Sequence, residues 1–265
     1  MRGNIRAKRT GIWLLLLLIT IGFVTSVGRA QNNPQIQFDQ ANSQLESGNY
    51  QQALSIYKLI ESQQTVSGSL YLNMAISYVQ LDSLGKAKYY FLKAQQFPET
   101  EGRAVSGLNY VESRFSRQSA VLPKLPWERF FDWLGSVISP TSLLGIAILL
   151  LNLGACSYIG GWFFPTVTKP LRVAGISISV ISMVIMLSSF YLQYLQNRYS
   201  QGVMIHQQAD VLEKPNPDAT LVSQAYEGYG FTVDHTVSRQ KEGWSYVRMS
   251  NGLYGWIPNS EIMIL

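Results

Sequence analysis

Side chains that could carry acid–base or covalent chemistry are few and scattered in this sequence. The two histidines, His206 and His235, have no cysteine or paired carboxylate at metal-ligand spacing, and the only cysteine, Cys156, lies inside an apolar run. The sequence shows no Ser/His/Asp arrangement of a catalytic triad, no phosphate-binding glycine loop and no metal motif. We therefore predict that the protein is not an enzyme and has no cofactor and no metal site, and a lone cysteine excludes an intrachain disulfide.

Amide and tyrosine side chains are the remaining candidates, because they can bind a peptide without covalent chemistry. Asn42 and Asn73 could hydrogen-bond the backbone of a bound segment, although a solvated polar position is the alternative. Tyr226, Tyr229 and Tyr254 could form an aromatic groove for a peptide. We predict these five residues as partner-binding positions.

The two asparagines belong to residues 31–118, where the sequence repeats with a period of about 34 residues. Small and aromatic residues recur in register, as Ala41, Ala53 and Tyr57 and then as Ala75, Ala87 and Phe91. Small residues let paired helices approach, and the aromatic ring fills the gap beside them, as in tetratricopeptide repeats. We predict an all-α tetratricopeptide domain of about two repeats, with a covering helix from Arg103 to about Arg117. So short a stack is marginal and could depend on a partner.

The tyrosines belong to residues 202–265, where apolar residues alternate with a period of two between turn signals. The predicted strands are Val203–Val211, Leu221–Ala225, Phe231–Val237, Trp244–Met249 and Leu253–Trp256. Asn251-Gly252 predicts a type I′ hairpin, in which both central residues adopt positive φ. The pattern predicts a small all-β barrel, and the spacing of Gly243-Trp244, Asn251-Gly252 and Gly255-Trp256 resembles bacterial SH3-like domains.

Two long uncharged runs separate these modules. No charged residue lies between Asp132 and Lys169, nor between Arg172 and Arg198. Each run exceeds the roughly 20 apolar helical residues that cross a hydrocarbon core. We predict a two-helix transmembrane hairpin with transmembrane helices over residues 139–164 and 171–195, joined by a cytoplasmic turn over residues 165–170. Ser139 would cap the first helix and Pro140 would begin it.

Asn152 is the most polar side chain of the first predicted span. If the turn is centred at Thr168, Asn152 and Ser182 reach nearly the same depth in an antiparallel hairpin. We predict that Asn152 faces Ser182 or another subunit rather than lipid, with a different membrane protein as the competing partner. Gly175 and Ser179 would give the second helix a small-residue face for close approach.

Residues 119–138 are predicted as a linker and an interfacial helix. Pro123 and Pro126 interrupt the helix, and the residues that follow can share an apolar face; they are Trp127, Phe130, Phe131, Trp133 and Leu134. Such a stretch is typical of a helix that lies in the membrane interface.

The formal net charge of +5 is explained by the N-terminus. Residues 1–30 carry five basic residues and no acid, so the remainder is neutral and no nucleic-acid partner is predicted. The basic start, the apolar run Ile12–Val24 and the small residues Gly28 and Ala30 predict a signal peptide over residues 1–30, with an uncleaved signal anchor as the alternative. We therefore expect a multi-pass protein of the cytoplasmic (inner) membrane whose soluble modules face the periplasm.

The order of signal, short tetratricopeptide array, two-helix hairpin and SH3-like C-terminus resembles the BatE-like proteins of the Bacteroides aerotolerance family, over essentially the whole chain. The resemblance implies a membrane-tethered scaffold that acts in oxidative stress tolerance. It also implies partners among other Bat-type membrane proteins, some of which bear von Willebrand A domains.

Two functions follow from the sequence. The first is a protein–protein interaction scaffold of the cell envelope, anchored in the lipid bilayer. The alternative is an envelope sensor whose SH3-like domain binds a peptide or peptidoglycan ligand.

Overall fold

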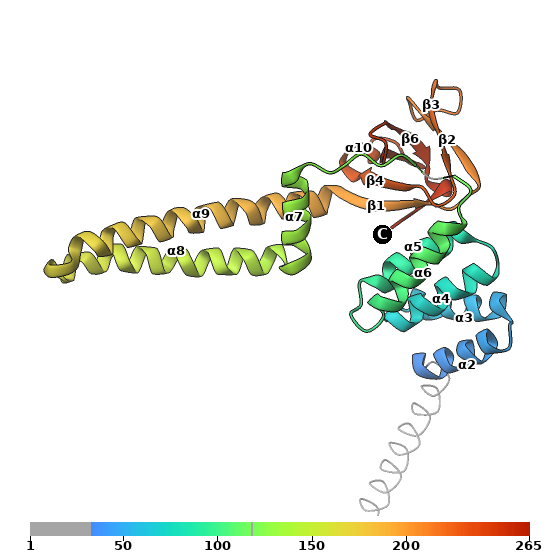
Figure 1. Ribbon diagram of the computed structural model, residues 1–265, viewed down its shortest axis with the longest axis horizontal. Helices are drawn as coiled ribbons and strands as arrows, with labels where there is room; N and C mark the ends of the chain where they lie inside the picture. Colours follow the sequence, from blue (N-terminus) through green and yellow to red (C-terminus); the bar gives the residue numbers. More distant parts are fainter. Residues whose placement is uncertain (1–32, 118) are drawn as a thin grey trace, which may run out of the picture. The chain divides into compact units, whose positions relative to one another are not determined.

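The computed structural model describes residues 33–117 and 119–265, and the chain divides into two compact units, Met1–Phe115 and Ser116–Leu265 (Figure 1). The signal peptide predicted over residues 1–30 lies outside the described residues. The described part of the first unit is helical, and the second unit holds a helical hairpin and a β-sheet.

The described part of the first unit consists of five helices. They are α2 (Pro34–Glu46), α3 (Tyr50–Ser62), α4 (Gly68–Gln80), α5 (Leu84–Gln95) and α6 (Glu101–Arg114). The interval from the start of α2 to the start of α4 equals the interval from the start of α3 to the start of α5. The turns repeat too, because Gly48 and Asp82 both adopt positive φ, at 79° and 52°. The period of the sequence is therefore a structural period.

The helices of this unit pack through the small and aromatic residues of the repeat. The alanines are fully buried, and they are Ala41, Ala53, Ala75 and Ala87. Tyr57 and Phe91 are buried beside them. A Cβ added to Gly107 of α6 would lie 2.3 Å from the Phe91 ring, so α6 packs tightly over the second pair, as a covering helix should.

The second unit begins with a helical hairpin. A short helix, α7 (Pro126–Val137), precedes α8 (Pro140–Phe163), the 3-10 turn η1 (Pro165–Val167) and α9 (Thr168–Arg198). Among the described residues, α8 and the stretch from η1 through α9 are long and apolar enough to cross a membrane. The Ser139 side chain accepts a hydrogen bond from the Ser142 N–H at 3.1 Å, which confirms the predicted cap.

The helix α9 begins at Thr168, earlier than expected, and it extends to Arg198 rather than to residue 195. The residues predicted as a turn, 165–170, therefore divide between η1 and the first turn of α9. Pro170 lies inside that first turn, where the missing N–H removes no helical hydrogen bond. A proline there does not delay the helix.

The remaining residues form a seven-stranded antiparallel sheet in the order β3-β2-β6-β5-β4-β1-β7 (Figure 1). The strands are β1 (Tyr199–Met204), β2 (Gln208–Leu212), β3 (Leu221–Tyr226), β4 (Gly230–Asp234), β5 (Trp244–Met249), β6 (Tyr254–Pro258) and β7 (Ile262–Ile264). Two short helices accompany them, α10 (His235–Ser238) and η2 (Asn259–Glu261). Val211 of β2, Ala225 of β3 and Ile262 of β7 share one core with the central strands, so the sheet curls until its ends meet over common side chains.

Three strand predictions need correction. The predicted strand Val203–Val211 is two strands, β1 and β2, separated by a turn at residues 205–207. The predicted strand Phe231–Val237 ends at Asp234, because that side chain accepts hydrogen bonds from the N–H groups of Thr236 and Val237 and caps α10. The strand β7 was not predicted, since so short a strand shows no visible alternation.

The predicted type I′ turn at Asn251-Gly252 is wrong. Only Gly252 of the pair adopts positive φ, at 86°. The Met249 N–H donates to the Leu253 carbonyl, and the Gly252 N–H donates to the Met249 carbonyl. These bonds define a three-residue loop, residues 250–252, whose last residue is left-handed. The hairpin between β5 and β6 was predicted correctly, but its loop is one residue longer.

Candidate functional site

Asn42 of α2 and Asn73 of α4 lie together in one hydrogen-bonded cluster with Tyr57 of α3. The Tyr57 hydroxyl donates to Asn42 Oδ1 at 2.7 Å, and Asn73 Nδ2 donates to the same oxygen at 2.9 Å. Burial raises the pKa of Tyr57 to about 12, against the opposing effect of its hydrogen bond with Asn73. The Asn42 carbonyl oxygen is thus used inside the unit, and a bound peptide would have to share it.

A second polar cluster of the first unit was not predicted. Lys93 Nζ of α5 lies 2.7 Å from Glu61 Oε1 of α3 and 4.2 Å from the centroid of the Tyr71 ring. The Tyr90 hydroxyl donates to the other Glu61 oxygen at 3.1 Å. Both charged side chains are about a quarter exposed, so the pair is shielded on most sides.

The environment keeps this lysine charged. Burial alone would lower the pKa of Lys93, but hydrogen bonds to Glu61 and Tyr71 outweigh burial and raise it. Burial, followed by the nearby Glu61 charge, raises the pKa of Tyr90, so its hydroxyl stays protonated and donates. Since Glu61 and Lys93 are separated by nearly one repeat period, that period was the only sequence signal for this pair.

The three predicted tyrosines of the β-sheet fall into two clusters. Tyr226 and Tyr229 pack edge to face with their ring centroids 5.6 Å apart. Tyr254 instead stacks on Tyr246, at 6.2 Å, and Tyr246 in turn contacts the buried Trp256. Of the three predicted residues, only Tyr226 and Tyr229 lie together, and Tyr254 belongs to the packing between β5 and β6.

The predicted contact between Asn152 and Ser182 does not form. Ser182 Oγ donates to the Ala147 carbonyl across the hairpin at 2.6 Å. Asn152 Nδ2 donates to the Ile148 carbonyl of its own helix, and its side chain is exposed. Asn152 therefore faces away from α9, which leaves another subunit or another membrane protein as its predicted partner.

The register of the hairpin explains this correction. Ser189 Oγ of α9 donates to the Pro140 carbonyl at 2.7 Å. Gly154 lies against Gly175, because a Cβ added to Gly154 would come within 2.9 Å of the Gly175 oxygen. In sequence, the midpoint of each of these pairs falls between Phe164 and Pro165, not at Thr168. The shift moves Ser182 more than one helical turn away from Asn152.

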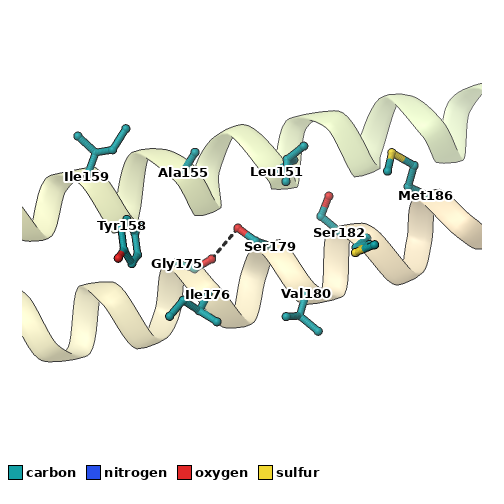
Figure 2. A pocket seen from close by; sticks show the side chains of 11 residues that line it. Leu151, Ala155, Tyr158, Ile159, Gly175, Ile176, Ser179, Val180, Ser182 and Met186 are labelled. Carbon is teal, nitrogen blue, oxygen red and sulfur yellow. Dashed lines mark hydrogen bonds between the residues drawn. The ribbon is translucent and has the colours of Figure 1, made fainter.

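One face of the hairpin carries an apolar groove of about 560 Å³ (Figure 2). Its residues come from both helices and include Leu151, Ala155, Tyr158, Ile176 and Met186. Gly175 and Ser179 also line it, and Ser179 Oγ donates to the Gly175 carbonyl at 2.8 Å, so this hydroxyl is bonded within α9. In a membrane this groove would fit an acyl chain or an apolar side chain.

The helix α7 packs against the C-terminal half of α9. The centroids of the Phe131 and Tyr191 rings lie 4.6 Å apart, and Gly135 lies close to Leu192. Three other aromatic side chains are at least half exposed, namely Trp127, Phe130 and Trp133. One face of α7 is thus an exposed aromatic surface beside a candidate membrane helix, as expected of an interfacial helix.

Arg198 and Asp234 form an ion pair where α9 meets the sheet. Arg198 Nη2 lies 2.8 Å from Asp234 Oδ2. Burial opposes ionisation of Asp234, but hydrogen bonds from Arg198 and from the Val237 and Thr236 amides outweigh it and hold the pKa of the carboxyl below its usual range. The pair joins the last residue of α9 to the cap of α10.

Each of the two histidines has one polar side-chain neighbour. His235 Nε2 lies 2.8 Å from Ser200 Oγ, and His206 Nδ1 lies 3.8 Å from a Glu261 oxygen. Within the described ranges, no group of three or more His, Cys, Asp and Glu side chains could hold a metal ion.

A scan against protein-family models finds no match to this chain, and a search of curated proteins finds none either.

Proposed function

We propose that this protein is a membrane-anchored interaction scaffold. The observation that carries the proposal is a hairpin of two apolar helices with a helical repeat on the chain before it and a β-sheet domain after it. Since α8 and α9 are antiparallel, both soluble parts emerge on the same side of a membrane that the hairpin crosses. Two modules tethered on one face raise the effective concentration of their ligands for each other.

The finer assignments are part of the same proposal. The helical unit acts as a tetratricopeptide-type module and the sheet as an SH3-like module, in line with the repeat period and the short antiparallel strands. The N-terminal signal pattern directs both to the periplasmic face of the inner membrane. The partners are Bat-type membrane proteins, including those with von Willebrand A domains, and the process is oxidative stress tolerance.

Photocrosslinking in native membranes tests the scaffold proposal. Ile76 of α4 lies one turn after Asn73 on the helix, and Leu59 of α3 is a comparably exposed apolar residue. A photoreactive residue at Ile76 should yield adducts with another membrane protein, and the same residue at Leu59 should yield far fewer. Equal yields from the two positions, or adducts only with lipid, would contradict a binding face beside Asn73 on α4.

A second candidate function is an envelope sensor that binds a peptide, including a peptidoglycan stem peptide. The observation in its favour is the Tyr226–Tyr229 pair, an aromatic platform of the kind that extended peptides dock on. Sedimentation of the detergent-solubilised chain with purified murein distinguishes the two. Murein binding that Tyr226→Ala abolishes supports the sensor, and no cosedimentation removes the peptidoglycan form of it.

A further inference from the structure

The segment before α7 lies on the β-sheet domain of its own unit. We call Arg117 and residues 119–125 the strap. The Arg117 guanidinium lies over the Tyr226 ring, 4.2 Å from its centroid. The Leu122 N–H donates to the Ser250 carbonyl at 2.9 Å, and Leu122 covers Gly252, where an added Cβ would come within 2.6 Å of Leu122 Cδ1. The strap is therefore anchored at two separate points.

The two anchor points lie on two loops of the sheet that a hydrogen bond joins. Tyr226 and Tyr229 lie on the turn between β3 and β4, which ends at Gly230. The Ser250 hydroxyl donates to the Gly230 carbonyl at 3.2 Å and so joins that turn to the loop between β5 and β6. The strap thus contacts both the tyrosine pair and residues 250–252, which are linked through Gly230 and Ser250.

At its C-terminal end the strap has the extended conformation of a proline-containing peptide ligand. Leu122 and Leu125 each precede a proline, which restricts them to extended backbone. Leu125 has φ −65° and ψ 153°, the values of a polyproline II helix. Pro123 and Pro126 stand at i and i+3, and segments of this pattern dock on aromatic surfaces of small β domains because little entropy is lost when they bind.

We propose that the Tyr226–Tyr229 pair and residues 250–252 form a binding surface for an extended, proline-containing peptide with an arginine on its N-terminal side, and that the strap occupies this surface in cis. The proposal rests on the second candidate function and deepens it, because it names the class of ligand and the regulation of the surface. An external segment of the same chemistry has to displace the strap.

Displacement of the strap also has a mechanical consequence. The strap continues directly into α7, and Glu128 of α7 lies 3.9 Å from Arg248 of β5. Since α7 packs on α9 through Phe131 and Tyr191, a displaced strap frees the N-terminal end of a helix that contacts the membrane hairpin. A short tether gives the strap an effective concentration of the order of millimolar, so an external peptide with the same intrinsic affinity has to reach a similar concentration to displace it.

A labelled copy of the strap tests the proposal in the detergent-solubilised full chain. The probe is a fluorescein-labelled peptide with the sequence of residues 116–127. The double variant Arg117→Ala, Leu122→Asp removes both anchors and should bind the probe at least about fivefold more tightly than the wild type, in which the tethered strap competes. Fluorescence anisotropy measures both affinities.

Two tyrosine variants locate the surface. Added to the double variant, Tyr226→Ala should abolish probe binding, because it removes the ring under the arginine. Tyr254→Ala, the matched control, should leave probe binding unchanged, because the Tyr254 ring packs on Tyr246 and under Arg248 rather than under Arg117. An equal loss of probe binding in the two tyrosine variants, or no probe binding by the double variant, overturns the proposed surface. Equal probe affinity of the wild type and the double variant overturns occupation of the surface by the strap in cis.

Amide exchange in the unmodified chain gives a second readout that needs no substitution. The Leu122 amide should be protected by its bond to Ser250, and excess unlabelled peptide should raise its exchange rate. An unprotected Leu122 amide contradicts the docked strap. Cosedimentation with murein tests the second candidate function without the strap peptide, so failure of that function and failure of the strap proposal give different results.

Discussion

At the scale of single residues, two ion pairs that join different elements are well shielded from solvent. Lys93 pairs with Glu61 between α5 and α3, and Arg198 pairs with Asp234 between α9 and the sheet. The other ion pairs of the described residues have at least one partner more than a third exposed, and such pairs contribute little. Substitutions at the two shielded pairs should therefore have the larger effects.

The first prediction concerns Glu61. Glu61→Gln removes the charge partner of Lys93 while keeping the side-chain shape, and should lower the stability of α3 and α5 by ~1.5–3 kcal/mol, the range for hydrogen bonds to charged groups. Glu112→Gln is the control, since Glu112 pairs with Lys88 but is half exposed, and it should cost less than ~1 kcal/mol. Amide exchange of the two helices in the solubilised chain measures both. Equal effects would contradict the shielding argument.

The second prediction is a pH dependence from Asp234. Because the pKa of this carboxyl is lowered by folding, its ionised form stabilises the protein above the ordinary value of 3.8, and that contribution is lost as the pH falls through the lowered pKa. Asp234→Asn keeps the helix cap but removes the charge facing Arg198. The variant should melt at a lower temperature than the wild type at about pH 7, with the difference narrowing toward roughly pH 3.

Thermal unfolding of the full chain in detergent micelles measures this difference. Asp218→Asn is the matched control, because Asp218 is an exposed carboxylate in the loop between β2 and β3. It should melt with the wild type at both pH values. A difference for Asp234→Asn that is the same at both pH values would show that its effect does not come from ionisation.

At the scale of the elements, the hairpin depends on one point of close backbone approach. A Cβ on Gly154 would lie 2.5 Å from Ser179 Oγ, and a Cβ on Gly175 would lie 2.7 Å from the Gly154 oxygen. In lipid, where apolar burial does not drive helix association, such small-residue contacts and the serine hydrogen bonds hold two helices together. Ser182 and Ser189 supply those bonds.

The third prediction follows from this geometry. Gly154→Leu should separate α8 from α9, whereas Gly160→Leu, on the same helix, should not, because nothing lies within 4 Å of a Cβ at Gly160. The readout is an oxidative crosslink between cysteines at positions 147 and 182, in a Cys156→Ser background. The crosslink should form in the parent and in Gly160→Leu and fall strongly in Gly154→Leu. Similar yields in both leucine variants would rule out the proposed contact.

Much of the element structure was predictable because its signals are local. The repeat fixes the spacing of α2 to α5 through turn residues such as Gly48 and Asp82, and Ser139-Pro140 marks the start of α8. Register was not predictable. The expected pairing of Asn152 with Ser182 depended on the turn centre, and a proline tolerated in the first turn of α9 shifted that centre.

The candidate site was predictable only in part, for a related reason. Tyr226 and Tyr229 stand in one turn, so their pairing is a local property. Tyr254 was grouped with them on composition, but strand pairing places it beside Arg248 and Tyr246. The strap contacts join residues that are far apart in the sequence, and nothing in the local pattern of Arg117 or Leu122 indicates where they dock.

At the scale of the whole molecule, the proposal depends on both soluble parts facing the same side of the membrane. The interhelical hydrogen bonds pair the start of α8 with the end of α9, so the two open ends of the hairpin lie together and η1 lies at the far end. The span of α8, 24 residues, corresponds to about 36 Å of helix, enough to cross a hydrocarbon core of ~30 Å.

The last prediction is therefore a labelling pattern. In a Cys156→Ser background, single cysteines replace Gln52 of α3, Thr166 of η1 and Asp218 of the β2–β3 loop, all of them exposed. A membrane-impermeant maleimide added to sealed vesicles of one orientation should label positions 52 and 218 together and leave 166 unlabelled, and the inverted vesicles should show the reverse. Permeabilised vesicles, in which all three positions should react, control for accessibility. If 166 labels from the same side as 218, the hairpin does not cross the bilayer, and if 52 and 218 label from opposite sides, the two modules cannot act together on one face.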